Sequence, residues 1–335
     1  MKTMLKDKRV QYVLIGLLCI ISLYSIPFKR STLTIMSTVA IYSIAAIGFN
    51  VLLGFAGQIS LGHAAFIGLG AYVSAYLTYD LGLPFLVALL MSAIVPIALG
   101  IILGLVALRL EGHFLAIATL GFGVAVQQVF KVVTKFTNGF AGKTAPLASI
   151  FGYTIKSGEA YFTMSVVILV VLAIITHNLI NSKTGRAFIA MRDSEHAAQA
   201  MGINLVKYKL IAFSVSAMFA GISGSLYMHL VKYTQPDVWG VVLSINLLAM
   251  VVIGGMASVG GSILGAAFIT LLPQLAHEIP VIKNITNSAI ILTGLAIVLV
   301  IRLLPGGLMV LGSEVHGLWR RQRTDRRMKH EHIEG

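Results

Sequence analysis

The chain has 335 residues, of which 57% are hydrophobic and 11% are charged, whereas soluble domains contain about 25% charged residues. Its formal net charge is +13, but the basic residues stand at the ends of apolar runs and in the C-terminal tail, which indicates membrane topology rather than a nucleic-acid partner. The single cysteine, Cys19, excludes a disulfide framework and a cysteine metal site. Composition therefore predicts an integral membrane protein.

Apolar runs recur along the whole chain, and a run of about 20 residues crosses the hydrocarbon core as a helix. The first run follows a basic N-terminus but has no small-residue cleavage site after it, so we expect it to be retained. We expect an all-α polytopic fold with about ten transmembrane spans. The expected spans are residues 10–26, 33–53, 64–81, 83–108, 114–133, 160–180, 210–231, 243–253, 263–277 and 288–303.

Two glycine-rich polar stretches interrupt the apolar runs, GFAGQISLGHAAFIGLGAY at 54–72 and GGMASVGGSILGAAF at 254–268. Glycine and free polar side chains are tolerated at membrane depth mainly where protein or a water-lined cavity covers them, so we expect broken or re-entrant helices here. The string Ala-Ala-Phe-Ile lies within the first stretch at 64–67 and recurs at the end of the second at 266–269, where Ile269 directly follows the stretch. This shared string indicates either a pseudo-repeat of two halves, with a substrate path at their interface, or a chance match.

The longest polar interruption covers residues 183–209 and has five basic residues against two acidic ones. The basic residues are Lys183, Arg186, Arg192, Lys207 and Lys209. Such a stretch is often a solvated connector between two spans. Its middle also has the pattern of a short helix, and we therefore interpret residues 183–209 as a docking loop for another protein.

The short helix expected within the docking loop has Asp193 or Ser194 as its N-terminal cap, Glu195 in its first turn and Gly202 at its end. A glutamate in the first turn is favoured by the helix dipole, and glycine is the usual residue just beyond a helix. The small apolar face expected on this helix, which would bind a groove on the partner, consists of Ala197, Ala198 and Met201.

Basic residues near span ends stay on the cytoplasmic side of a membrane, so we expect both termini in the cytoplasm. The expected parts are a cytoplasmic N-terminus at 1–9, a transmembrane domain at 10–311 and a basic cytoplasmic tail at 312–335. An even number of spans also places the docking loop inside. Three lysines run against this topology, because it places their loop outside: Lys135, Lys143 and Lys156.

A proton-coupled transporter or a membrane enzyme holds ionisable groups at membrane depth, but the acidic residues here fall near span ends or in loops. His63 is the only ionisable residue beside a glycine-rich stretch. Gly142-Lys143-Thr144 resembles the end of a phosphate-binding loop, but Thr137 stands where that motif requires glycine. We therefore expect no enzymatic activity, no cofactor and no metal, and we expect a partner chain to supply the energy.

Four motifs together resemble the membrane permease subunit of branched-chain amino acid ABC importers. They are the glycine-rich stretch at 54–72, GHFLAIATLGFG at 112–123, KTGRAFIAMRDSEHAAQAMGINLVKYKLIAF at 183–213 and VVIGGMASVGGSILGAAF at 251–268. The resemblance extends over residues 33–311 and does not include the basic tail. It implies an importer of the bacterial inner membrane, built from two related permeases, two cytoplasmic ATPases and a periplasmic binding protein, with membrane lipid around it.

The family's coupling helix, which docks on the ATPase, carries Glu-Ala-Ala followed by a glycine a few residues later. This chain has Glu195-His196-Ala197-Ala198 and then Gly202, so His196 is inserted relative to the strict pattern. The resemblance implies ATPase-coupling roles for Glu195, Ala197, Ala198 and Gly202. It also implies leucine, isoleucine and valine as substrates. Importers of urea or short amides are the alternative within the class, and an ion-coupled secondary transporter is the alternative outside it.

A zwitterionic substrate needs polar groups inside the membrane domain. The candidates for the translocation path lie in broken or glycine-rich places and are Gln58, Ser60, His63, Thr119 and Ser262. Hydrogen bonding between neighbouring helices is the alternative role for these side chains.

Overall fold

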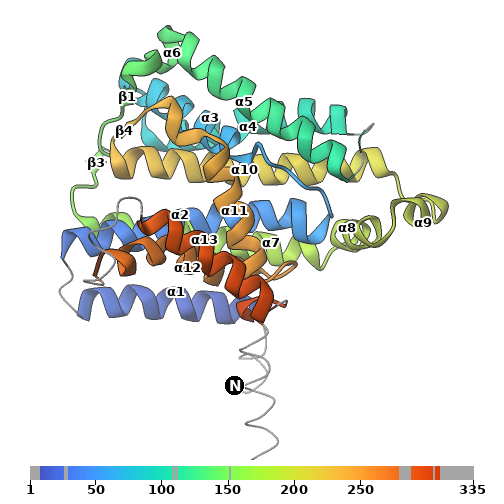
Figure 1. Cartoon of the computed structure of the whole chain (residues 1–335). Coiled ribbons are helices and arrows are strands. Elements are labelled where there is room, and N and C mark those ends of the chain that lie inside the picture. The colour runs from blue at the N-terminus through green and yellow to red at the C-terminus, as the bar shows by residue number, and fades with distance from the viewer. Residues whose placement is uncertain are drawn as a thin grey trace, which may run out of the picture.

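The computed structural model describes residues 8–25, 29–107, 110, 112–150, 152–278, 288–304 and 306–309. Most of these residues are helical, and most of the long helices run roughly parallel in one bundle (Figure 1). Helices α8 and α9 lie at one end of the bundle, the α9 end, and β1, β3 and β4 lie toward the opposite end, the strand end. The expected basic tail at 312–335 and residues 1–7 of the expected N-terminal part lie outside the described residues.

The first half of the chain forms long helices that correspond to the expected spans. Two of them end in a turn of π-helix, which lengthens the helix without a break. In chain order these elements are α1 (Lys8–Ser25), α2 (Arg30–Asn50), η2 (Val51–Phe55), α3 (His63–Ala75), η3 (Tyr76–Asp80), α4 (Phe85–Ala107) and α5 (His113–Val132). Between η2 and α3, residues 56–62 are not helical, as the sequence predicts for the first glycine-rich stretch. We call residues 56–62 the broken segment.

The second half of the chain continues the bundle, and its docking loop folds into two helices, α8 and α9, rather than the single helix expected. The main elements of this half are α7 (Gly158–Ile180), α8 (Lys183–Asp193), α9 (Glu195–Ala200), α10 (Leu205–Val231), α11 (Val241–Gly254), α12 (Val259–Glu278) and α13 (Ser288–Leu303). The second glycine-rich stretch is interrupted as well, at residues 255–258, and is helical from Val259 onward. These four residues form a tight turn between α11 and α12, so the predicted interruption is present but shorter than the stretch.

Short elements at the strand end add two small ladders to the all-α fold that the sequence predicts. The connection from α5 to α7 contains α6 (Thr134–Thr137), η4 (Gly139–Ala141), β1 (Lys143–Thr144), β2 (Ser149–Ile150) and β3 (Tyr153–Thr154), and β4 (Tyr233–Thr234) and η5 (Pro236–Trp239) follow α10. β1 pairs antiparallel with β4, so that Lys143 lies opposite Thr234, and β2 pairs antiparallel with β3. The β1–β4 ladder therefore joins two connections that are far apart in the sequence.

Five of the described helices are long and apolar enough to cross a membrane. They are Arg30–Phe55, Phe85–Leu105, His113–Val132, Gly158–Ile180 and Leu205–Val231, and Val241–Gly254 and Val259–Gln274 are shorter apolar helices. The outer helices α4 and α5 expose large apolar side chains, among them Leu90, Phe114 and Ile117. Hydrocarbon tails can cover such side chains, so the chain is a mostly helical, polytopic membrane protein.

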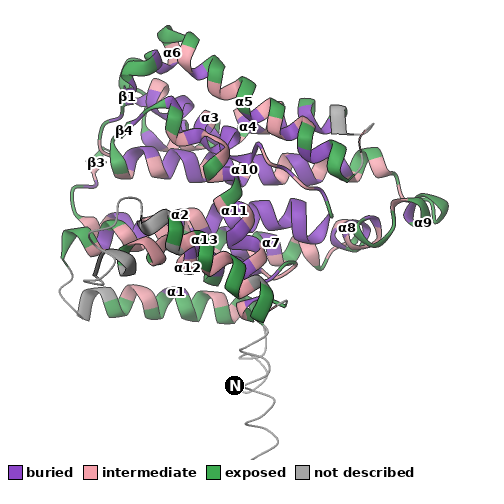
Figure 2. Ribbon diagram, viewed as in Figure 1, coloured by how far each residue is buried: buried purple, intermediate pink, exposed green. Residues whose placement is uncertain are grey.

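α10 lies in the interior of the bundle and packs against α2, α3 and α4. Figure 2 shows that buried residues are concentrated along α10, whereas α1 and α5 are largely exposed or half-buried. α3 runs beside α10 in the same direction, because His63 lies near Ser216 and Ser74 lies near His229. The two helices approach closely at Gly224, where an added Cβ would overlap the carbonyl oxygen of Ile67. Only glycine permits this approach.

Candidate functional site

The helix expected in the docking loop is present as α9, and the sequence prediction of its start and end is confirmed. Ser194 is the N-terminal cap, since its Oγ accepts a hydrogen bond from the backbone nitrogen of Ala197 at 3.2 Å. Asp193, the alternative cap, instead pairs with Arg192 at 2.9 Å. Gly202 follows the helix with a φ of +81°, a conformation that side chains other than glycine adopt at a cost.

The apolar face expected on α9 is divided between two sides of the helix. Ala198 is only 3% exposed and packs inside this chain, whereas Met201 is 84% exposed. Ala197 is exposed as well. The expectation of one outward face formed by Ala197, Ala198 and Met201 was therefore wrong, and only Ala197 and Met201 remain available to a partner.

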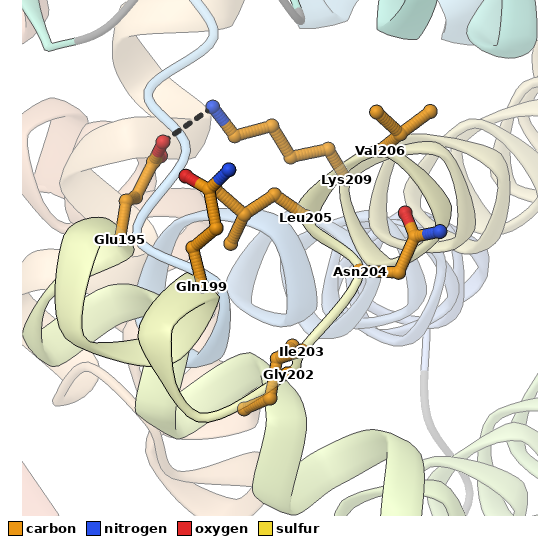
Figure 3. Close-up of a pocket in the computed structure, with 8 residues that line it drawn as sticks. All are labelled: Glu195, Gln199, Gly202, Ile203, Asn204, Leu205, Val206 and Lys209. Carbon is orange, nitrogen blue, oxygen red and sulfur yellow. Dashed lines mark hydrogen bonds and ion pairs between the residues drawn. The ribbon is translucent and has the colours of Figure 1, made fainter.

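Glu195 points back into the protein, where both of its carboxylate oxygens are occupied. Oε2 lies 2.6 Å from Nζ of Lys209, and Oε1 accepts a hydrogen bond from Nε2 of Gln58 at 3.1 Å. Lys209 is 2% exposed and belongs to the first turns of α10, so its assignment to a polar loop was wrong. Figure 3 shows the ion pair beside a cavity of about 480 Å³ between α9 and the start of α10.

Arg192, the last basic residue of α8, forms a second contact between the docking loop and the first glycine-rich stretch. Its Nη1 donates a hydrogen bond to the carbonyl oxygen of Gly54 at 3.1 Å. Its side-chain carbons pack beneath Gly57, where an added Cβ would lie 3.0 Å from Cγ of Arg192. The chain therefore holds residues 54–58 from two sides, through Arg192 of α8 and Glu195 of α9.

The broken segment leads to His63, the first residue of α3, in the interior of the bundle. Its Nε2 lies 3.3 Å from Oγ of Ser216, and its ring packs against Phe49 with 4.7 Å between centroids. Among the described residues, Nδ1 of His63, Oγ of Ser60 and Oε1 of Gln58 are buried without a hydrogen-bond partner. A buried polar atom without a partner is costly, so these three atoms within residues 58–63 remain available for further hydrogen bonds.

Thr119 and Ser262 differ from these residues because their hydroxyl groups are already paired. Oγ1 of Thr119 accepts a hydrogen bond from the backbone nitrogen of Leu61 at 3.0 Å and donates one to Ala116. Oγ of Ser262 lies 2.7 Å from Nδ2 of Asn50. The five candidates for the translocation path therefore do not form one cluster. Ser60, His63 and Thr119 lie around the end of the broken segment, Gln58 lies at α9, and Ser262 lies beside α2.

Asn50 is a fully buried residue that the sequence reasoning missed. Its Nδ2 donates hydrogen bonds to Ser262 and to the carbonyl oxygen of Ser258, at 2.7 and 3.0 Å, and its Oδ1 accepts one from the backbone nitrogen of Ala257 at 3.0 Å. A single amide at the end of an apolar run is expensive to bury without partners, and this was the available signal. Asn50 holds the turn between α11 and α12 against α2.

The chain is similar to known permeases over most of its length. The family described as "Branched-chain amino acid transport system / permease component" matches residues 31–301. The high-affinity branched-chain amino acid transport system permease protein LivM of Salmonella typhimurium is 32% identical over 79% of this chain and 68% of its own length, and LivM of Escherichia coli is 31% identical over the same shares. The ribose import permease protein RbsC of Haemophilus influenzae is 25% identical over 76% of this chain and 78% of its own length.

Proposed function

This chain belongs to the branched-chain amino acid transport permease family, and we propose on that basis that it is the membrane subunit of an ATP-driven importer of leucine, isoleucine and valine. The observation that carries the proposal is the 32% identity to LivM of Salmonella typhimurium over 289 residues. The family match at 31–301 includes both the docking loop and the broken segment. The chain is a transport subunit, and we assign ATP hydrolysis to cytoplasmic partner chains.

The remaining partners follow from the same assignment. We propose a second related permease subunit in the membrane, a periplasmic binding protein that delivers the substrate, and membrane lipid around the exposed apolar helices. We assign the importer to a bacterial inner membrane. The chain is also similar to a ribose permease, so similarity supports the general class of importer without separating one substrate from another. Importers of urea or short amides remain the second candidate.

We assign ATPase coupling to α9 and propose that Glu195, Ala197, Ala198 and Gly202 each have a different role in it. Ala197 lies on the exposed side of the helix, together with Met201, and contacts the ATPase. Ala198 and Glu195 face inward and fix α9 to the rest of the permease. Gly202 ends the helix with the backbone conformation that lets the chain turn back toward α10.

We propose ten crossings, with the α9 end in the cytoplasm, residues 10–311 as the permease domain, and 1–9 and 312–335 as cytoplasmic ends. The contact of Tyr12 with His177, at 6.3 Å between ring centroids, supports this topology, because it places the start of α1 beside the end of α7, just before α8. Three lysines lie in the loop that this topology places outside. One of them, Lys143, is buried and paired with Asp80 at 2.5 Å, so it counts less against the topology than an exposed lysine does.

The two pairs α2–α3 and α11–α12, each interrupted near a glycine-rich stretch, support a pseudo-repeat of two halves.

We place the translocation path at the end of the broken segment, lined there by Ser60, His63 and Thr119, and extend it to Gln58 beside α9 and to Ser262 beside α2. Ser60 and His63 carry the argument, because each has a buried polar atom without a partner. They stand at the N-terminus of α3, inside the bundle. A helix that begins within a membrane protein directs its positive dipole end at an anionic group, and the carboxylate of an amino acid is such a group.

Uptake by the complete complex tests this function. The permease, co-expressed with its partner permease and ATPases and supplied with binding protein, is expected to accumulate radiolabelled leucine in proteoliposomes only when ATP is enclosed with the ATPases. Unlabelled isoleucine and valine should compete, whereas urea should not. Accumulation that follows a sodium gradient without ATP contradicts the proposal and favours the ion-coupled transporter. Accumulation of urea or a short amide in place of leucine favours the second candidate.

A further inference from the structure

We infer that Gln58, Glu195 and Lys209 are positioning residues, and that they form the internal link through which movement of α9 reaches the substrate path. The inference rests on the proposed function, because it takes α9 as the element that the ATPase moves. It assigns Glu195 to a contact within the permease, rather than to a contact with the ATPase, and it gives Lys209 a role in transport.

The three side chains come from three different elements, and Glu195 joins them. Gln58 belongs to the broken segment, Glu195 begins α9, and Lys209 lies in the first turns of α10. The two contacts of Glu195, 3.1 Å to Gln58 and 2.6 Å to Lys209, use one carboxylate oxygen each. Charge-assisted hydrogen bonds of this kind are short and directional. Both carboxylate oxygens of Glu195 are therefore engaged within the permease in this arrangement.

The broken segment is the part of the bundle that such a link can move. It lies between the end of η2 and the start of α3 and lacks the regular hydrogen bonds of a helix. Its backbone is held at separate points, among them Gln58 N to the carbonyl oxygen of Leu52 at 2.9 Å and Leu61 N to Oγ1 of Thr119 at 3.0 Å. At one end Gln58 is bound to Glu195, and nearby Arg192 is bound to Gly54. At the other end the segment passes Ser60 and reaches His63. A displacement of α9 therefore pulls on Gln58 and shifts two residues of the proposed path.

The surroundings of α9 leave room for this displacement. The cavity of about 480 Å³ beside the ion pair separates α9 from the start of α10, and Gln199, Gly202 and Asn204 contribute to its wall (Figure 3). A Cβ added to Gly202 would meet nothing within 4 Å. α9 therefore has space on the side of α10, and the connection at Gly202 is the point about which it turns.

A double variant separates the link from simple loss of stability. Removing one partner of a buried ion pair leaves an uncompensated charge, whereas removing both with groups of similar size is often neutral. We therefore combine Glu195→Gln with Lys209→Met in the complete complex of permeases and ATPases. Lys207→Met is the matched control, because Lys207 is an exposed lysine two residues away.

Three quantities are measured for each complex: ATPase co-purified with the permease, the rate of ATP hydrolysis, and leucine taken up per ATP hydrolysed. The double variant should bind as much ATPase as the wild-type chain, while its uptake per ATP falls about tenfold or more. The control should match the wild type in all three quantities. Unchanged uptake per ATP in the double variant overturns the inference.

Loss of ATPase from the double variant, but not from the control, also overturns the inference, since Glu195 or Lys209 then contacts the ATPase directly. That outcome leaves the proposed function intact. A wild-type permease that neither binds an ATPase nor supports ATP-driven uptake instead refutes the proposed function.

Gln58→Met is the second variant, because it removes the amide while keeping the buried ion pair, and it serves if the double-variant permease itself cannot be recovered in folded form. Its uptake per ATP should fall even at saturating leucine, while the amount of co-purified ATPase stays the same. A change confined to the leucine concentration that gives half-maximal uptake, with uptake per ATP unchanged, overturns the link.

Discussion

Nδ2 of Asn50 lies 2.7 Å from Oγ of Ser262, two residues that are 212 positions apart in the sequence. This hydrogen bond fixes the end of α2 to the beginning of α12, and the same asparagine also holds the turn before α12. The polar side chains of this permease thus serve two purposes. Some tie distant helices together, and others remain without partners inside the bundle.

Asn50→Ala is expected to destabilise the permease by roughly 2–4 kcal/mol, because it removes three hydrogen bonds and leaves the nitrogen of half-buried Ala257 without this acceptor. The midpoint of thermal unfolding in detergent measures the effect. Asn181→Ala is the control, since Asn181 is exposed and its side chain bonds to His177, one turn earlier in the chain. Equal midpoints for the two variants contradict the role given to Asn50.

Gly224→Ala is expected to destabilise the contact between α3 and α10 by about 1–3 kcal/mol, since the new Cβ overlaps the carbonyl oxygen of Ile67. Gly121→Ala, on exposed α5, provides the comparison. A Cβ at Gly121 meets nothing within 4 Å, and alanine favours the helix by up to about 1 kcal/mol. The two variants should therefore shift the unfolding midpoint in opposite directions, and a shift in the same direction argues against the close approach.

The two sides of α9 can be distinguished by labelling single cysteines with a membrane-impermeant maleimide. In a Cys19→Ser background, Met201→Cys should react rapidly in inside-out vesicles and Ala198→Cys slowly, because Met201 is exposed and Ala198 is buried. Binding of the ATPase should protect Met201→Cys. Reaction of Met201→Cys in right-side-out vesicles instead shows that the orientation proposed for the α9 end is inverted.

Lys143→Met tests the strand end. Lys143 is buried, lies 2.5 Å from Asp80 and pairs through β1 with β4. Its removal should cost about 1–2 kcal/mol, because Asp80 loses its partner but is a third exposed, so that water screens part of the loss. Lys156→Met, at an exposed lysine of the same connection, should leave the unfolding midpoint unchanged. An equal loss in both variants indicates a general effect of charge rather than the ion pair.

Local patterns in the sequence predict the helices of this bundle well. Membrane spans depend on the length and apolarity of one run, and α9 depends on the cap at Ser194 and the glycine at 202, all of which are visible within a few residues. The first glycine-rich stretch predicts the broken segment for the same reason. The basic residues at the ends of runs also agree with the arrangement of the docking loop at one end of the bundle.

Pairings between distant residues are what the sequence does not predict. In the sequence, Lys209 stands at the end of a polar stretch and is typical of a loop lysine. In the structure it belongs to α10, which begins at Leu205, and its side chain pairs with Glu195. The inward orientation of Glu195 and Ala198 on α9 also depends on tertiary packing. The strands contain two residues each, which is too short for a periodic pattern, and β1 and β4 are joined only through their separate places in the fold.

The hydrogen bonds that cross the bundle also constrain how the permease is made. Gln58 is synthesised 137 positions before its partner Glu195, and Asn50 is synthesised 212 positions before Ser262. Both side chains therefore lack these distant partners while the first helices are being inserted. We expect the final packing of the early half of the chain to wait for synthesis of the late half.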